Sequence, residues 1–327
     1  MASEKADILL LGPPRPLVVD ALSAAANVHK LAETKDRNAL FAELAQRVRA
    51  MAVCGPVEPI NEALMSRFPC LEIVSSFGVG YDHVDAKWAG AHGVTVTNTP
   101  DVLNEEVADT ALGLLLCTVR EFPQAERYLR AGNWVEKSYP LTKATLRDRK
   151  IGMVGMGRIG KAIARRLDAM LVPVVYHGRS RQADVPYRYY DDLVAMARDA
   201  KIILAIAPGG AGTNNMINAA VLDALGPDGI VINMARGSLV DEPALIKALK
   251  DKKIFAAGLD VFVDEPKVPP ELVEMENVVL FPHLGSASLH TRQAMDQLVV
   301  DNLVAWAAGN PPLTPVPETP WPPSGRR

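Results

Sequence analysis

Cysteine is scarce in this sequence. Only Cys54, Cys70 and Cys117 occur, widely spaced and with no Cys-x-x-Cys pair. This scarcity argues against a disulfide framework and against a zinc site, and it favours a reducing compartment. We expect all three to be small apolar core residues, because free cysteine is among the most often buried residue types.

Long hydrophobic runs are also missing. The longest helical apolar stretch, 110–119 (TALGLLLCTV), is far below the ~20 residues that span a bilayer. The apolar run before Gly12 is too short for the core of a signal peptide. We therefore predict a cytoplasmic protein with no membrane contact, and we interpret 110–119 as part of a buried helix.

The sequence has no strong excess of charge of either sign. Its 35 basic and 38 acidic side chains give a formal net charge of −3, which argues against general binding of nucleic acid but leaves a local basic pocket open. A content of 49% apolar and 22% charged residues is typical of globular proteins, and 327 residues suggest two domains.

Short apolar segments alternate with amphipathic ones along most of the chain, which predicts βαβ units and parallel sheets. In the first part, strands are expected at 7–12, 49–55, 71–78 and 93–100, with a helix over 37–48. After residue 150, six strands are expected at 150–155, 172–178, 200–207, 229–235, 256–262 and 277–282, with helices between them. Such a set makes a complete dinucleotide-binding domain.

A glycine loop, GMGRIG, joins the first two elements of that domain. Gly155, Gly157 and Gly160 follow an apolar strand and open an amphipathic helix, which is the context that this motif requires. Gly155 would permit the tight turn, Gly157 the approach of a diphosphate, and Gly160 close packing of helix on strand. N–H groups at the helix start would then meet the diphosphate.

A basic turn follows the second strand of this domain. An acid at this place binds the ribose 2′-hydroxyl of NAD, but the sequence has Arg179, Ser180 and Arg181 instead. Two guanidinium groups and a hydroxyl suit a 2′-phosphate. The turn therefore favours NADPH over NADH, and a simple solvated basic turn stays the alternative.

Three polar residues follow later strands of the same sheet, at the carboxyl ends where open α/β sheets bind ligands. They are Arg236, Glu265 and His283. Together they suit the reduction of a 2-oxo acid, because a guanidinium grips a carboxylate and histidine donates a proton near neutral pH. A carboxylate beside the histidine would fix its tautomer and favour its protonated form.

The order of motifs resembles one known family. SSFGVGYDHVD, NTPDVLNEEVADTALGLLL, GMGRIG, INMARGSLVDE, GLDVFVDEP and FPHLGS succeed one another over nearly the whole chain. The sequence resembles the D-isomer-specific 2-hydroxyacid dehydrogenases, and more narrowly the NADPH-preferring glyoxylate/hydroxypyruvate reductases and their hydroxyphenylpyruvate-reducing relatives. The N-terminal strands and the Pro-rich tail carry no such signal.

The resemblance implies roles for particular residues. Arg236 would hold the substrate carboxylate, and His283, paired with Glu265, would donate the proton in reduction. Arg158 and Ile159 would lie at the diphosphate, and Asp260 would face the nicotinamide carboxamide. The remaining implied contacts are Ala235 with the cofactor, and Val79, Gly80 and Trp134 with the substrate. For Trp134, an ordinary interface aromatic is an equally good interpretation.

The resemblance also implies an architecture. A Rossmann-type cofactor domain, 99–289, would be inserted in a flavodoxin-like substrate domain formed by 1–98 and 290–327, with the active site in the cleft between them. A homodimer would form through 101–146, and no metal is implied. We expect the Pro-rich tail, 310–327, to cross the surface without regular structure.

The predicted function is NADPH-dependent reduction of hydroxypyruvate or glyoxylate to a D-2-hydroxy acid. Larger substrates such as phenylpyruvate, hydroxyphenylpyruvate or ketogluconate stay open. 3-Phosphoglycerate, formate and phosphite dehydrogenases are less favoured, the first for want of regulatory domains and the others because they prefer NAD. A nucleotide-sensing corepressor of the same fold is a rival from another class, against which the basic turn and balanced charge argue.

Overall fold

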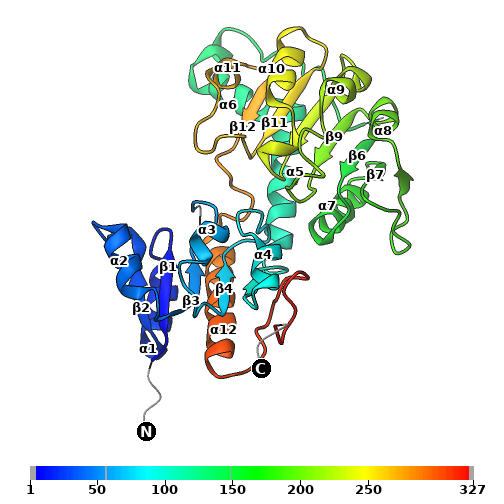
Figure 1. Cartoon of the computed structure of the whole chain (residues 1–327). Coiled ribbons are helices and arrows are strands. Elements are labelled where there is room, and N and C mark those ends of the chain that lie inside the picture. Colours follow the sequence, from blue (N-terminus) through cyan, green and yellow to red (C-terminus); the bar gives the residue numbers. More distant parts are fainter. Residues whose placement is uncertain (1–4, 56, 148, 324–327) are drawn as a thin grey trace. The chain divides into compact units, whose positions relative to one another are not determined.

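The chain folds into two compact units in the computed structural model, which describes residues 5–55, 57–147 and 149–323. One unit comprises Met1–Leu103 and Ser288–Arg327, and the other comprises Asn104–Ala287. The second unit is therefore an uninterrupted segment, whereas the first is assembled from both ends of the chain. Figure 1 shows the first unit in blue to cyan for its N-terminal part and dark orange to red for its C-terminal part, and the second unit in teal, green, yellow and light orange.

A five-stranded parallel sheet forms the centre of the first unit. Its order, β2-β1-β3-β4-β5, is that of flavodoxin-like folds. The strands are β1 (Asp7–Leu11), β2 (Asn27–Lys30), β3 (Val48–Val53), β4 (Ile73–Ser76) and β5 (Thr95–Thr97). The edge strand β2 was not predicted, because it is half-exposed and has no apolar run.

Helices cover both faces of this sheet, as its apolar strands require. On one face α1 (Pro16–Ala25) packs against α12 (Leu289–Ala307). On the other lie α2 (Arg37–Leu44), α3 (Glu62–Met65) and α4 (Ala86–Ala91). The helix predicted over 37–48 is too long: it ends at Leu44, and Val48 already begins β3.

The Pro-rich tail is part of this unit. Its described residues form no helix or strand, as predicted, but the prediction that it crosses the surface is wrong for its middle, which is buried against β5. Pro315 forms an antiparallel bridge with Thr97 at the open edge of β5. The N–H of Val316 donates to the Val96 carbonyl at 2.9 Å, which is possible because the prolines that lack an N–H stand on either side of it. Val316 and Thr319 are both 2% exposed.

A seven-stranded parallel sheet forms the centre of the second unit, in the order β12-β11-β10-β9-β6-β7-β8. Counted from β6, this is the dinucleotide-binding order with one further strand at the end. The strands are β6 (Ile151–Val154), β7 (Val174–His177), β8 (Arg188–Tyr190), β9 (Ile202–Ala205), β10 (Ile230–Asn233), β11 (Ala256–Leu259) and β12 (Val278–Leu280). The six predicted strands are confirmed; the short edge strand β8, RYY, was missed because it carries no apolar run.

Two helical layers cover this sheet. The helix α5 (Asn104–Arg120) packs on α7 (Arg158–Ala169) and on β10, β11 and β12. The helices α8 (Leu193–Asp199), α9 (Ala219–Leu225) and α10 (Glu242–Lys250) pack in sequence and share one apolar core with the strands. The buried helix predicted at 110–119 is the central part of α5, whose apolar side is buried.

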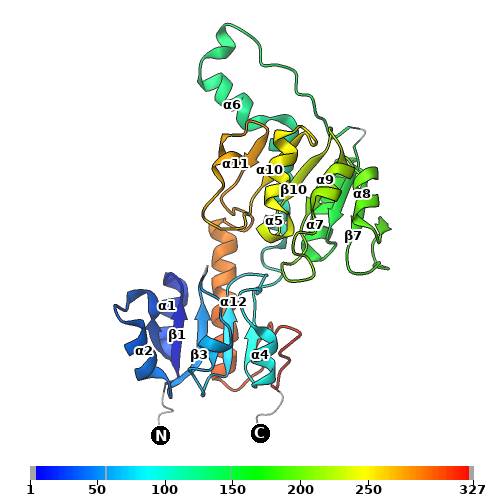
Figure 2. The ribbon, with the colours of Figure 1, turned by 45° about the horizontal axis from the view of Figure 1, so that its top comes forward.

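An arm follows α5 and leaves the body of the second unit. It consists of α6 (Phe122–Arg130), the 3-10 turn Asn133–Val135 and the irregular segment that leads to β6, and Figure 2 shows it looping away from the sheet. Several large apolar side chains on it are exposed: Phe122, Leu129, Trp134, Val135 and Leu141. Within the arm, Tyr128 and Tyr139 pack edge to face with ring centroids 5.3 Å apart.

The three cysteines are free, but only Cys54 is fully buried, whereas Cys70 and Cys117 are half-buried. The expectation of core residues is therefore confirmed for Cys54 alone. Burial is the main reason why the pKa of Cys54 is raised to about 12. Among the helices described, none combines the length and the apolarity that a bilayer crossing demands.

Candidate active site

The glycine loop lies between β6 and α7, where the sequence predicted it. Gly155 has a φ of +105°, and a Cβ on it would lie 2.8 Å from the backbone N of Ala207. A Cβ on Gly160 would lie 2.7 Å from the Gly155 carbonyl oxygen. The fold itself therefore requires glycine at both positions.

Gly157 differs from the other two glycines of the loop. A Cβ built on it would have no neighbour within 4 Å, so packing does not explain why this residue is glycine. It is also the N-cap of α7, and no side chain caps the helix there. The N-terminus of a helix such as α7, which begins with Arg158 and Ile159, is a favourable place for an anion such as a diphosphate. These features fit the predicted cofactor.

The basic turn lies directly after β7. Arg179, Ser180 and Arg181 are exposed, and the structure records no hydrogen bond or ion pair of their side chains with any part of the chain that it describes. Gln182 anchors the turn: its N–H donates to the Tyr176 hydroxyl at 2.7 Å, and its Nε2 donates to the Met156 carbonyl at 2.8 Å.

The contact with Met156 links the basic turn to the glycine loop. Gln182 was not predicted, because nothing in the sequence distinguishes this glutamine from a solvated loop residue. Gln182 therefore links the two predicted parts of the cofactor site, through its backbone N–H to the Tyr176 hydroxyl and through its side chain to the Met156 carbonyl.

Arg236 lies in the turn after β10. Asn233, which is 1% exposed, closes this turn: its Oδ1 accepts from the Ala235 N–H at 3.1 Å, and its Nδ2 donates to the Arg236 carbonyl at 2.9 Å. A Cβ on Gly237 would lie 2.0 Å from the carbonyl carbon of Phe262. Only glycine lets this turn touch the backbone that leaves β11, so Asn233 and Gly237 position Arg236 beside the segment carrying Glu265.

Glu265 and His283 form a direct pair. His283 Nδ1 and Glu265 Oε2 are 2.7 Å apart, and Glu265 Oε1 accepts from the Phe262 N–H at 3.0 Å. Burial alone would raise the pKa of Glu265, but the hydrogen bond and charge of His283, with the charge of Arg236, outweigh it and leave that pKa lowered. The charges of His283 and Arg236 thus both act on the carboxylate of Glu265, within the second unit.

The backbone of His283 is in the left-handed region, with a φ of +53°, which is uncommon for a residue with a side chain. Asp260 holds it there: its carbonyl accepts from the His283 N–H at 2.9 Å, and its carboxylate accepts from the N–H groups of Leu284 and Gly285 at 2.5 and 2.9 Å. Burial raises the pKa of Asp260, and these N–H groups oppose the rise. Asp260 thus fixes the loop that carries His283.

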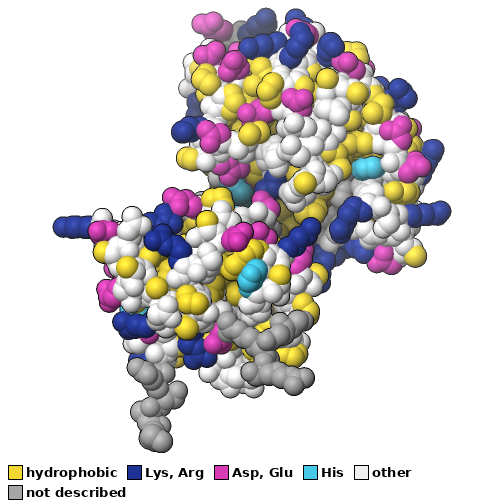
Figure 3. All heavy atoms as spheres, viewed as in Figure 1, with side chains coloured by type: hydrophobic (Ala, Val, Ile, Leu, Met, Phe, Trp, Pro, Cys, Tyr) yellow, Lys and Arg dark blue, Asp and Glu magenta, His cyan; other side chains and the backbone are white. Residues whose placement is uncertain are grey.

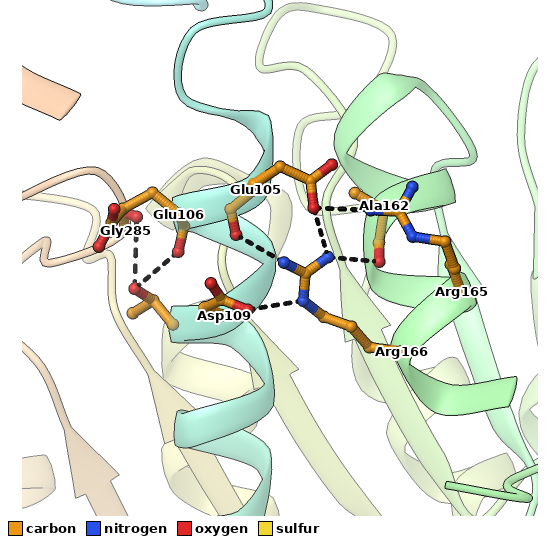
Figure 4. A network of polar contacts seen from close by, with 8 residues as sticks. Glu105, Glu106, Asp109, Ala162, Arg165, Arg166 and Gly285 are labelled. Carbon is orange, nitrogen blue, oxygen red and sulfur yellow. Dashed lines mark hydrogen bonds and ion pairs between the residues drawn. The ribbon is translucent and has the colours of Figure 1, made fainter. Parts of the chain in front are cut away.

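Helix α5 connects the glycine-loop helix and the histidine loop (Figure 4). Arg166 on α7 binds Asp109 at 2.7 Å and Glu105 at 2.8 Å. On α5, the Thr110 hydroxyl lies 3.3 Å from the Gly285 carbonyl. One helix therefore contacts both predicted halves of the site in this unit.

The other predicted substrate residues lie elsewhere. Val79 and Gly80 belong to the loop after β4 in the first unit, where both are half-buried. Trp134 lies on the arm of the second unit and is 64% exposed. Among the described residues no group of three or more His, Cys, Asp or Glu side chains could hold a metal ion. On the face that Figure 3 shows, basic and acidic side chains are interspersed.

A doubly wound sheet, a glycine loop that leaves room for a diphosphate, and a histidine–glutamate pair beside an arginine define an NAD(P)-linked dehydrogenase. Residues 112–285 match the family model for the NAD binding domain of D-isomer specific 2-hydroxyacid dehydrogenases. The chain belongs to the D-isomer-specific 2-hydroxyacid dehydrogenase family, as the resemblance predicted.

Individual relatives agree with this assignment. The chain is 40% identical to a glyoxylate/hydroxypyruvate reductase of Arabidopsis thaliana, over 96% of this chain and 99% of the relative. It is 46% identical to the hydroxyphenylpyruvate reductase of Plectranthus scutellarioides, over 77% and 80% of the two chains. A solved NADPH-dependent glyoxylate/hydroxypyruvate reductase of Sinorhizobium meliloti, in complex with NADP and malonate, matches with a TM-score of 0.92 and 49% identity over 97% and 98%.

Proposed function

We propose that this enzyme reduces small 2-oxo acids, hydroxypyruvate and glyoxylate, to 2-hydroxy acids with NADPH as cofactor, and that hydroxypyruvate gives the D isomer. The observation that carries the proposal is the 2.7 Å pair of His283 and Glu265, with Arg236 close enough to lower the pKa of Glu265. An acid, its orienting carboxylate and a carboxylate receptor are the groups that this reaction needs.

The substrate carboxylate would be bound by Arg236, whose guanidinium can donate two parallel hydrogen bonds to it. The N–H groups of Val79 and Gly80 would supply further donors. Binding at the carboxylate would orient the keto carbon and leave its oxygen to His283.

His283 would donate the proton. Its Nδ1 faces Glu265, which leaves Nε2 as the nitrogen that gives its proton to the carbonyl oxygen as negative charge develops there. The carboxylate of Glu265, charged because its pKa is lowered, favours the protonated imidazole and fixes its orientation. NADPH, when bound, supplies the hydride.

NADPH in preference to NADH is supported by the basic turn. Arg179, Ser180 and Arg181 are exposed and anchored beside the glycine loop through Gln182, so their side chains are available to a 2′-phosphate. The Sinorhizobium relative, whose complex contains NADP, supports the same choice.

The choice of small substrates rests on the relatives that are named glyoxylate or hydroxypyruvate reductases. The hydroxyphenylpyruvate and 2-ketogluconate reductases among the relatives favour larger substrates as the second candidate. A corepressor-like role is disfavoured by the basic turn and by the balanced charge of the chain.

We further propose a cytoplasmic homodimer. The support for a dimer is the arm, whose apolar side chains Leu129, Trp134, Val135 and Leu141 are between 55% and 96% exposed. Such a patch is typical of an interface. Light scattering on the purified protein tests it, and a monomer at micromolar concentration would contradict it.

Initial rates test the proposed function. NADPH and NADH should be compared with hydroxypyruvate, glyoxylate and phenylpyruvate on one enzyme preparation. We expect the highest kcat/KM for NADPH with the small acids. Equal or better use of NADH would refute the assignment of the basic turn, and faster turnover of phenylpyruvate would move the substrate to the larger class.

A further inference from the structure

Backbone carbonyl groups of the loop that carries Val79 and Gly80 accept hydrogen bonds from Asn98 and Thr99. The Gly78 carbonyl accepts from the Thr99 N–H at 2.9 Å, and the Val79 carbonyl accepts from Asn98 Nδ2 at 2.8 Å. Thr99 Oγ1 also accepts from the Gly78 N–H at 2.9 Å. The loop is thus attached to the two residues after β5 by three hydrogen bonds.

These bonds decide where the next N–H groups point. A peptide unit is planar and almost always trans, so its N–H is directed opposite to its C=O. A bond to the Gly78 carbonyl therefore orients the Val79 N–H, and a bond to the Val79 carbonyl orients the Gly80 N–H. Within the described chain, neither of these N–H groups donates a hydrogen bond. They are the two donors that the proposed function assigns to the substrate carboxylate.

Asn98 is in turn held by the C-terminal tail. The Thr314 hydroxyl donates to the Asn98 carbonyl at 2.6 Å, and the Asn98 N–H donates to the Thr314 carbonyl at 3.3 Å. The same hydroxyl accepts from Asn302 Nδ2 at 2.9 Å, and Asn302 Oδ1 accepts from the Thr314 N–H at 3.0 Å. Asn302 lies on α12 and is 0% exposed.

The tail is fixed beyond Thr314 as well. Thr319 Oγ1 accepts from the Val96 N–H at 2.8 Å. Glu318 Oε2 accepts at 3.0 Å from the hydroxyl of Tyr81, which follows Gly80 in the loop of residues 78–81, here called the substrate loop. A Cβ on Gly90 of α4 would lie 2.4 Å from the Glu318 carbonyl oxygen, so glycine in α4 makes room for the tail. In Figures 1 and 2 the red tail lies beside α4 in both views.

We propose that the C-terminal tail positions the substrate loop: Thr314, anchored by Asn302, holds Asn98, which orients the peptide unit carrying the Gly80 N–H. Thr314 is a positioning residue, because it bonds the backbone of Asn98 and not the loop. The inference rests on the proposed function for the roles of Val79 and Gly80. Its consequence is that a segment far from Arg236 and His283 in sequence sets the affinity for the 2-oxo acid.

The test removes one hydroxyl and keeps the tail in place. Thr314→Val deletes the hydroxyl's bonds to the Asn98 carbonyl and to Asn302 Nδ2 but retains the backbone bonds of Thr314 to Asn98 and to Asn302 Oδ1. Thr314→Ser restores a hydroxyl. Leu313→Ala, at a neighbouring residue that is 55% exposed, is the matched control. Steady-state rates with hydroxypyruvate at saturating NADPH give KM and kcat, and thermal unfolding reports the fold.

We expect Thr314→Val to raise KM for the 2-oxo acid about three- to tenfold, the effect of one hydrogen bond, with kcat within about twofold of wild type. The serine variant should return KM to near the wild-type value, and the control should match wild type. An unchanged KM, a loss confined to kcat, or a serine variant that fails to restore KM would overturn the inference. If Thr314→Val does not fold, Glu318→Ala, which removes the acceptor of the Tyr81 hydroxyl, takes its place, and it must raise KM in the same sense.

Hydrogen exchange separates this inference from the proposed function. The amides of Gly78 and Thr99, which hydrogen-bond each other and attach the loop to the residues after β5, should exchange faster in Thr314→Val than in wild type, whether or not the enzyme turns over any 2-oxo acid. Unchanged exchange would overturn the positioning role. A wild-type enzyme without activity on 2-oxo acids, but with the expected exchange, would overturn the proposed function alone.

Discussion

Glu265 Oε2 lies 2.7 Å from His283 Nδ1, and the same carboxylate uses its other oxygen to accept the Phe262 N–H at 3.0 Å. The carboxylate is thus held by backbone on one side and faces the imidazole on the other. It can orient His283 without having to move, which is the property required of a partner that stabilises an imidazolium.

Glu265→Gln should lower kcat by about 10²-fold, because a neutral amide stabilises the imidazolium far less than a carboxylate does. The amide can still orient the imidazole, but it brings no charge to balance the imidazolium that gives the proton. Profiles of kcat for both enzymes between pH 4 and pH 10 check this. A wild-type kcat in the glutamine variant across this range would show that the charge of Glu265 has no part in the reaction.

The acid limb of the wild-type profile should not come from Glu265. Its pKa is lowered by His283 and Arg236 in spite of burial. The carboxylate therefore keeps its charge as pH falls through about 4.3, the pKa of an unperturbed glutamate. For the same reason its contribution to folding is present above that range and is lost only below it.

His283→Ala should lower kcat by about 10²- to 10⁴-fold, the usual contribution of a general acid. Binding of NADPH should change little, because the glycine loop and the basic turn are separate from His283. Single-turnover rates check the expected loss of turnover, and a fluorescence titration with NADPH checks cofactor binding. Weakened NADPH binding with preserved turnover would exclude His283 as the proton donor.

Arg236→Lys should raise KM for the 2-oxo acid by one to two orders of magnitude, since an ammonium cannot form the paired hydrogen bonds of a guanidinium. The positive charge near Glu265 is retained in this variant, so the pH profile should keep its shape. Steady-state kinetics with hydroxypyruvate measure both. A wild-type KM would refute the carboxylate role.

The double variant Arg179→Ala with Arg181→Ala should lower kcat/KM for NADPH by about 10²-fold and leave that for NADH unchanged, because only NADPH carries the 2′-phosphate. Arg198→Ala is the matched control, an exposed arginine of the same unit. Equal losses with both cofactors would show that the turn supports the fold rather than the phosphate.

What the sequence could predict depended on whether a signal is local. Short apolar runs predicted six strands of the second sheet. The seventh, β8, comprises only Arg188–Tyr190 and has no apolar run. Arg236, Glu265 and His283 each follow a strand, so the parallel topology brings them to one edge.

Residues that position these groups were not predictable, because their effect depends on contacts between distant segments. Gly237 matters through Phe262, and Gln182 through Met156. The prolines of the tail predicted an irregular segment but not its path, which follows the open edge of β5 through the bond from the Val316 N–H to the Val96 carbonyl.

Gly157→Ala and Gly160→Ala distinguish cofactor binding from packing within one loop. A Cβ at residue 157 meets nothing within 4 Å, whereas a Cβ at 160 would lie 2.7 Å from the Gly155 carbonyl oxygen. The backbone of Gly157, with φ −75° and ψ −164°, is also open to alanine. We therefore expect Gly157→Ala to keep the wild-type unfolding temperature and to weaken NADPH binding at least about tenfold, because the methyl group would occupy space that the diphosphate needs.

Gly160→Ala should lower the unfolding temperature by several degrees, since overpacking costs about 1–3 kcal/mol. Calorimetry without cofactor and fluorescence titration with NADPH give the two quantities. If Gly157→Ala binds NADPH as wild type does, the open space beside residue 157 is not where the diphosphate lies.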